Sequence, residues 1–152
     1  MDGSVFEGIQ KAVAADGYAF FTEFFNNFYN TDLLLGKRVS EQVVQASWNT
    51  AVGASATASL ACVPTWYEDF RKDLARIDVP ALVIHGNADR ILPITASGQR
   101  TAKLIKGARS VVVKDGPHCI TWTHADEVNQ ELVNFLGAAK RAGSVLEKEA
   151  VA

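Results

Sequence analysis

The feature that most constrains the fold is a run at residues 80–86, which is apolar from Ala81 to Ile84 and bounded by a proline and a glycine. A short, continuous apolar run with these ends is typical of a strand that is buried on both faces, as in a parallel sheet. A second run, at 110–113, is rich in β-branched residues, and a helical pattern at 94–106 separates the two runs. Strand, helix and strand in this order predict a right-handed βαβ unit with two parallel strands.

Residues 1–75 carry helical patterns instead. A first helix is predicted from apolar residues at helical spacing, and it breaks at the Asp16-Gly17 pair. A wide aromatic stripe then covers one face of a second helix and is formed by Phe20, Phe21, Phe24, Phe25 and Phe28. Such a stripe must be buried, and its expected role is helix-packing core. One wall of an apolar pocket, or a subunit contact, is the alternative.

Polar capping residues mark the other predicted helices. Ser40 is a candidate N-cap for a helix through Trp48, and an Ala-rich segment at 51–61 predicts another. The last helix is predicted to follow Thr123 as its N-cap, with Asp126 three residues later. Its expected buried face consists of Val128, Leu132, Phe135 and Leu136.

Only two strands are predicted, and this makes the architecture incomplete. A two-stranded parallel sheet is rarely stable alone, since parallel sheets need covered faces and several neighbouring strands. The first strand would leave a long apolar edge unpaired, which natural proteins avoid or use to pair with another chain. We therefore expect either a missing piece of the fold or a partner.

Composition excludes several classes of function. Fifteen Lys and Arg stand against seventeen Asp and Glu, for a formal net charge of −2. Without a dense basic cluster, neither nucleic acid nor an anionic membrane surface is an expected partner. No apolar run approaches the roughly 18 residues that a membrane span needs. The first residues lack a signal-peptide pattern, and two cysteines cannot make a disulfide framework, so a cytoplasmic setting is expected.

Two acid–base candidates follow the predicted strands. Asp89 lies just beyond the first strand, in the string HGNAD, and His118 lies just beyond the second, in GPH. Adjacent parallel strands bring the loops at their carboxyl ends side by side. The carboxylate could then bind the imidazole Nδ1–H while Nε2 acts as a general base. The alternative is that Asp89 caps the helical region near Pro93 and His118 is an ordinary loop histidine.

These residues also carry a resemblance. The order strand, HGNAD, helix, strand, GPH, helix resembles the last third of an α/β-hydrolase. Four strings are similar to those of the cofactor-free bacterial haloperoxidases, also called non-haem chloroperoxidases, bromoperoxidases or perhydrolases: FFNNFYN at 24–30, SWNT at 47–50, TWYEDFR at 65–71 and WTHADEVN at 122–129. The resemblance covers about residues 1–137.

The resemblance implies a partial α/β-hydrolase fold. Residues 1–75 would be the helical cap, or lid, over the active site, and 76–137 the βαβα part of the core. Residues 138–152 lie beyond the resemblance, and their Ala-rich and Lys-rich composition predicts a helical or frayed tail. Asp89 and His118 would be the acid and the base of a Ser-Asp-His triad. No cofactor or metal is implied, because the serine of the complete enzyme would attack a small ester and hydrogen peroxide would then attack the acyl-serine.

The sequence departs from the family at the nucleophile. A nucleophile elbow needs Gly-x-Ser-x-Gly between a strand and a helix, and the sequence contains no such string. The nearest string, at 53–57, lacks the final glycine and follows a helix. The early strands and the loop that would supply oxyanion-hole donors are absent as well.

Two functional hypotheses follow from this pattern. The first is the C-terminal half of a serine hydrolase and perhydrolase, inactive alone and completed by an N-terminal half. The second is a natural or engineered self-assembling half-domain, whose sheet is completed by homo-oligomerisation.

The remaining reactive residues have simpler expected roles. A metal site at His85, Asp89 and His118 would lack a closely spaced pair of ligands, and Cys119 is not expected to be a nucleophile. His85 is expected to satisfy a backbone group at its strand end. His124 is expected at the surface, and Trp122 in core packing or below His118 in the pocket.

Overall fold

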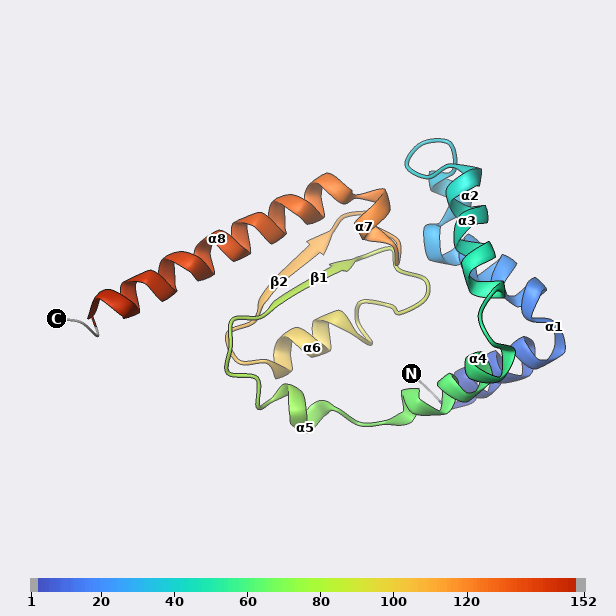
Figure 1. Cartoon of the computed structure of the whole chain (residues 1–152), viewed down its shortest axis with the longest axis horizontal. Coiled ribbons are helices and arrows are strands. Elements are labelled where there is room, and N and C mark those ends of the chain that lie inside the picture. Colours follow the sequence, from blue (N-terminus) through green and yellow to red (C-terminus); the bar gives the residue numbers. More distant parts are fainter. Residues whose placement is uncertain (1–2, 150–152) are drawn as a thin grey trace.

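The computed structural model describes residues 3–149, and side chains through residue 138. N-terminal helices form one part of the molecule, and a parallel strand pair flanked by helices forms the other (Figure 1). The elements in chain order are α1 (Gly3–Tyr29), α2 (Thr31–Leu34), α3 (Glu41–Val52), α4 (Ala56–Cys62), the 3₁₀ helix η1 (Val63–Tyr67), α5 (Arg71–Leu74), β1 (Leu82–Gly86), α6 (Gly98–Leu104), β2 (Arg109–Val113), α7 (Ile120–Thr123) and α8 (Ala125–Glu149).

The strand pair confirms the predicted βαβ unit. β1 and β2 pair in parallel, from Leu82 opposite Arg109 to Gly86 opposite Val113. α6 lies on one side of the pair and α8 on the other (Figure 1). Ile84 packs against the buried cluster that includes Val113 and Val128, the latter from α8. Helices on both sides explain why a continuous apolar run, and not an alternating one, encodes β1.

α1 consists of two helical segments joined at Asp16, as the sequence predicts. The backbone of Asp16 is extended, with φ −157° and ψ 94°. Its side-chain Oδ1 accepts a hydrogen bond of 3.0 Å from the amide of Ala19. Asp16 therefore caps the second segment, which carries the aromatic stripe.

The aromatic stripe divides between two roles. Phe25 is buried in a cluster with Tyr29 and Val39, against which α3 also packs. The neighbouring rings of the stripe contact one another at centroid distances between 5.3 and 6.4 Å. Most of the stripe thus contributes to helix-packing core, and part of it also lines the cavity described below.

Serine caps fix the boundaries of α3 and α4. The Ser40 hydroxyl accepts from the amide of Val43, as predicted, and α3 then continues past Trp48 to Val52. α4 begins only after Ser55, whose hydroxyl accepts from the amide of Ala58. Residues 53–55 of the string therefore connect the two helices, with Ser55 engaged as a cap, and the rest of the string begins α4.

The helix between the strands is shorter than predicted. α6 begins at Gly98, whereas the sequence pattern favours a start at Ile94. Residues 93–97 form turns instead, with the amide of Ala96 bonded to the carbonyl of Pro93 at 2.8 Å. The Ser97 hydroxyl donates to the same carbonyl at 2.9 Å, and these local bonds replace the first helical turn.

The C-terminal helices also differ from prediction. Thr123 ends α7 and does not cap the next helix, because its hydroxyl donates to the carbonyl of Cys119 at 3.0 Å. Along α8, Val128 is buried, but Leu132 and Leu136 are 41% and 63% exposed. The described elements that pack against α8 are mainly α7 and β2, so only part of its apolar face is covered.

Neither outer edge of the two-stranded sheet pairs with a further strand in the part of the chain that the structure describes. Within residues 3–149, β2 is the only strand that pairs with β1.

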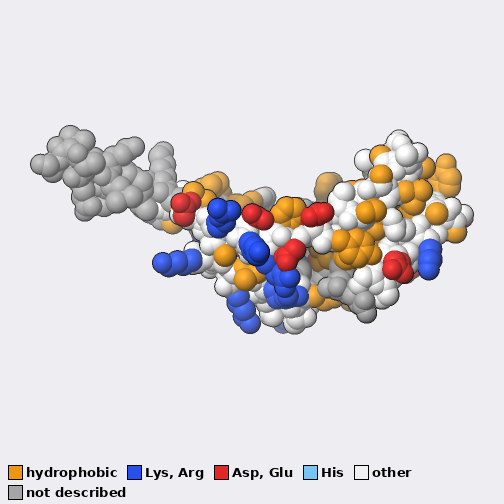
Figure 2. All heavy atoms as spheres, turned by 90° about the horizontal axis from the view of Figure 1, so that it is seen from below, with side chains coloured by type: hydrophobic (Ala, Val, Ile, Leu, Met, Phe, Trp, Pro, Cys, Tyr) orange, Lys and Arg blue, Asp and Glu red, His pale blue; other side chains and the backbone are white. Residues whose placement is uncertain are grey.

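No helix in that range is long and apolar enough to cross a bilayer. Seen from below, hydrophobic side chains are prominent over the N-terminal helices at the right, and charged ones gather near the middle (Figure 2).

Candidate active site

The loops that follow β1 and β2 touch through their backbones. A Cβ atom added to Gly86 would lie 2.1 Å from the carbonyl oxygen of Gly116, so only glycine fits there. The amide of Asn87 donates to the carbonyl of Val113 at 3.1 Å, and the amide of Ala88 to that of Gly116 at 3.0 Å. These contacts bring the segments that carry Asp89 and His118 together.

Asp89 and His118 form a hydrogen-bonded pair. Nδ1 of His118 lies 2.8 Å from Oδ2 of Asp89. The other carboxylate oxygen, Oδ1, accepts the amides of Ile91 and Leu92, each at 2.8 Å. One oxygen of Asp89 thus organises its own loop and the other binds the imidazole, whereas no helix begins near Pro93 for the carboxylate to cap.

The two members of the pair differ in exposure. The Asp89 side chain is 3% exposed, whereas that of His118 is 29% exposed. Burial opposes ionisation of Asp89, but the hydrogen bonds from His118 and from the amides of Leu92 and Ile91 outweigh it and lower the pKa of the carboxyl. The pair thus combines a buried carboxylate with an imidazole open on one side.

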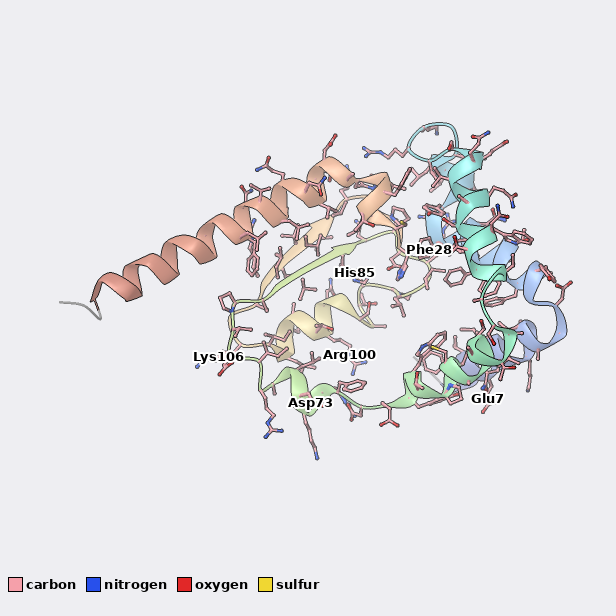
Figure 3. The ribbon with its side chains drawn as sticks, viewed as in Figure 1. Glu7, Phe28, Asp73, His85, Arg100 and Lys106 are labelled. Carbon is pink, nitrogen blue, oxygen red and sulfur yellow. The ribbon has the colours of Figure 1, made fainter. Side chains whose placement is uncertain are left out.

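His85, labelled in Figure 3, is the last residue but one of β1 and lies close to the same carboxylate. Its Nε2 lies 2.9 Å from the carbonyl oxygen of Leu92, which confirms the expected contact with a backbone group. The same nitrogen is also 3.1 Å from Oδ2 of Asp89. This second imidazole at the carboxylate is a feature that the sequence pattern does not reveal.

The end of α1 rests on both loops. The Phe28 ring lies 5.0 Å from the His118 ring, centroid to centroid, and its carbonyl accepts the amide of Cys119 at 3.2 Å. Asn30, 1% exposed and in the left-handed region at φ 50°, donates from Nδ2 to the carbonyl of Ala88 at 2.9 Å. The sequence marks Asn30 only as part of a turn, so its contact with the Asp89 loop is found from the structure alone.

Charged groups reinforce this contact. Both guanidinium nitrogens of Arg90 bind the Asp32 carboxylate, at 2.8 and 3.0 Å. Arg38 donates to the carbonyl of Thr123 at 2.9 Å. The segment from Phe28 to Arg38 is therefore held against the loops after both strands.

An apolar cavity of about 620 Å³ lies next to His118. His118 is the one ionisable ring in a wall that otherwise consists mainly of aliphatic and aromatic side chains from α1, α4 and η1 together with the loop after Asp89. The stripe contributes Phe20, Phe21 and Phe24 to this wall. The pocket-wall interpretation of the stripe thus holds for these three residues.

Two sequence expectations near the site are wrong. His124 is 4% exposed and not at the surface, because the turn between α7 and α8 directs its Nδ1 to the Thr123 hydroxyl at 2.9 Å. Trp122 is 55% exposed, so it neither packs in the core nor lines the cavity beside His118.

Other reactive groups do not form a second centre in the described region. Among the residues that the structure describes, no three His, Cys, Asp or Glu side chains are arranged to hold a metal ion. The sulfur of Cys119 has the Thr121 hydroxyl as a neighbour at 3.9 Å. The Asp89–His118 pair beside the apolar cavity is the candidate site.

Comparison with known proteins identifies the family to which the chain belongs. The family model of the alpha/beta hydrolase fold matches residues 3–125, and the chain belongs to that family. Within it, the chain is similar to non-haem haloperoxidases. It is 55% identical over 136 residues to a Synechocystis sp. protein whose name assigns it provisionally to the non-heme chloroperoxidases. It is 32% identical over 133 residues to a non-heme haloperoxidase of Rhodococcus erythropolis.

These matches cover most of this chain and about half of each relative. They span 90% and 87% of this chain, but 49% and 48% of the two relatives. A crystal structure of a bromoperoxidase from Bacillus anthracis superposes with a TM-score of 0.84 at 35% identity, covering 90% of this chain and 50% of that one. The chain is thus a half-length homologue with a partial α/β-hydrolase fold.

Proposed function

We propose that this chain is the C-terminal half of a cofactor-free haloperoxidase, that is, of a serine hydrolase with perhydrolase activity. Asp89 and His118 are the acid and the base of its Ser-Asp-His triad. The serine and the oxyanion-hole donors belong to the other half of the fold, and the 152 residues alone do not turn over esters.

The observation that carries the proposal is the hydrogen bond between His118 and Asp89. The carboxylate is buried and engages Nδ1 at 2.8 Å, while the ring also forms part of the cavity wall. A bond to Nδ1 fixes the tautomer, leaves Nε2 free to accept a proton and stabilises the imidazolium that results. This is the arrangement that a general base needs.

The proposed chemistry uses the pair twice. His118 Nε2 takes the proton of the incoming serine hydroxyl as the serine attacks the ester carbonyl, and returns it to the departing alcohol. It then takes a proton from water, or from hydrogen peroxide, as that molecule attacks the acyl-serine, and it passes this proton to the serine oxygen as the acyl–oxygen bond breaks. Water gives a carboxylic acid and peroxide gives a peracid, and the peracid oxidises halide in solution. The apolar cavity suits the uncharged part of a small ester.

The open edge of β1 supports a second candidate function. A parallel strand with an unpaired apolar edge is a site for strand addition. The partner is either the N-terminal half of the fold or a second copy of this chain. In the second case the chain is a self-assembling half-domain, and its assembly is structural, since a second copy contributes no serine elbow.

The test is reconstitution. The chain is mixed or co-expressed with the part of the Synechocystis sp. relative that it does not match, which under this proposal is the N-terminal half. Complex formation is followed by native mass, hydrolysis with p-nitrophenyl acetate, and peracid formation by bromination in the presence of peroxide. The chain alone is expected to stay at background, and the complex to hydrolyse the ester.

Variants assign the activity to the pair. His118→Ala and Asp89→Asn should each lower turnover of the complex by about 10³-fold or more, since the members of a triad act as a unit. Glu7→Gln, on the exposed face of α1, is the matched control and should leave turnover unchanged. A complex that forms but shows no His118-dependent turnover refutes the proposal, and so does His118-dependent turnover by the chain alone.

A further inference from the structure

His85 stands at the start of a chain of contacts that ends at His118. Its Nε2 binds the carbonyl of Leu92 at 2.9 Å. The amide of the same residue, Leu92, donates to Oδ1 of Asp89 at 2.8 Å. The other oxygen of Asp89 meets Nδ1 of His118 at 2.8 Å. Leu92 therefore accepts a hydrogen bond from His85 at its carbonyl and donates one to the Asp89 carboxylate from its amide.

The contact with Leu92 fixes the proton on His85. A carbonyl oxygen can only accept a hydrogen bond, so Nε2 must carry the proton. The nearby Oδ2 of Asp89, 3.1 Å from Nε2, faces this same N–H. The N–H group thus lies between the Leu92 carbonyl and the carboxylate oxygen that His118 uses.

Packing leaves the His85 ring little freedom. A Cβ added to Gly98 would lie 2.7 Å from Nδ1 of His85 and 2.9 Å from its Cγ, so α6 touches the ring directly. The side chain is 16% exposed. The Ser97 hydroxyl adds a second bond to the Leu92 carbonyl at 3.1 Å. The ring is therefore clamped between α6 and the loop that it holds.

We infer that His85 is a positioning residue for the Asp89–His118 pair. By holding Leu92, its Nε2–H sets the rotation of the Asp89 carboxyl group, so that one oxygen remains on the loop amides and the other faces His118. That this role serves catalysis rests on the proposed function. The effect of His85 on the position of the Asp89 carboxylate does not depend on that function.

The experiment uses the ¹⁵N- and ¹³C-labelled 152-residue chain and needs no nucleophile. The first readout is the low-field proton resonance of His118 Nδ1–H bonded to the carboxylate, assigned by its loss in Asp89→Asn. The second is the pKa of Asp89, followed by its carboxyl ¹³C shift. Thermal unfolding of each variant reports whether the chain is folded.

Three substitutions separate positioning from packing. His85→Gln places an amide N–H near the position of Nε2, His85→Asn is too short to reach the Leu92 carbonyl, and His85→Leu has no donor. His85→Asn and His85→Leu are expected to lose the low-field resonance and to raise the pKa of Asp89 toward its ordinary value. His85→Gln is expected to retain the resonance.

Other outcomes overturn the inference. If the resonance and the pKa of Asp89 persist in His85→Asn and His85→Leu while the melting temperature falls, His85 is a packing residue only. If His85→Leu does not fold, the comparison of His85→Gln with His85→Asn decides. The inference is also overturned if both of these variants lose the resonance, or if both fail to fold. None of these readouts involves turnover. A failed reconstitution test would therefore not change the conclusion about His85.

Discussion

The three histidines of this chain differ in what their ring nitrogens meet. His85 binds a carbonyl, His118 binds a carboxylate, and His124 lies against the Thr123 hydroxyl. The pKa of the His124 side chain is lowered by its surroundings. Burial is the main cause, the nearby Arg38 guanidinium adds to it, and Glu127 and Asp115 oppose it. The titration of His124, which is not part of the cavity wall, should therefore affect folding.

The stability of the chain should therefore fall as the pH drops below about 6.5. The folded state binds a proton at His124 more weakly than the unfolded state does. The contribution of the neutral ring is complete above the unfolded pKa, and it is lost below that value until the folded ring is also protonated. The slope is at most about 1.4 kcal/mol per pH unit for one site. Urea unfolding at pH 7.5 and 5.5 measures it, and His124→Gln should flatten the dependence. Equal slopes in both proteins would contradict this explanation.

The decisive contact between elements is the crossing of the two loops at Gly86 and Gly116. A methyl group at Gly86 would meet backbone atoms of the neighbouring loop and not the end of a flexible side chain. Since neither loop can move without breaking the bonds from Asn87 and Ala88, the clash cannot be relieved locally. The spacing of Asp89 and His118 thus depends on the absence of a side chain.

Gly86→Ala is expected to lower the free energy of unfolding by about 3 kcal/mol and to separate the pair. Urea unfolding measures the first effect, and the low-field resonance of His118 measures the second. Gly8→Ala is the matched control, because no atom lies within 4 Å of the added methyl group in the helix. It should be neutral or stabilising by up to about 1 kcal/mol. If the Gly86→Ala chain were as stable as the control, with the resonance intact, the crossing would be refuted as a constraint.

Sequence patterns predict these elements to different degrees. The parallel pair of strands is local and apolar, so residues 80–86 and 110–113 predict it correctly, and with it the approach of Asp89 and His118. The start of α6 depends on turns at 93–97 and on the approach of Gly98 to His85. The inward turn at His124 depends on the break between α7 and α8. Such contacts are tertiary, and helical periodicity alone does not contain them.

The molecule as a whole presents the outer edge of β1. The amide of Arg109 donates to the Ala81 carbonyl, and the amide of Asn87 donates to the Val113 carbonyl. The backbone N–H and C=O groups of the odd-numbered residues of β1 therefore point toward β2. Backbone groups alternate along a strand, so the N–H of Leu82 faces the open edge. This group can be removed without breaking the described sheet.

Leu82→Pro should therefore weaken strand addition, whether the partner is a second copy or the N-terminal half. Removing an edge donor costs an interchain hydrogen bond, and we expect about a tenfold weaker association, measured by sedimentation over a dilution series. Leu82→Ala removes the side chain but keeps the N–H, and is the control. Equal weakening by both variants would mean that side-chain packing, and not the strand edge, drives association.

The break in α1 at Asp16 affects how the shape of the cavity can change by mutation during evolution. The segment before it supplies Val5, Phe6, Ile9 and Val13 to the wall and is tied to η1 through the bond from the Tyr67 hydroxyl to the Gly3 carbonyl. The segment after it ends on the loops that hold Asp89 and His118. Residues before the break can thus be exchanged to reshape the cavity while Asp89 and His118 stay in place, and under the proposed function that segment is the natural target for altering substrate preference.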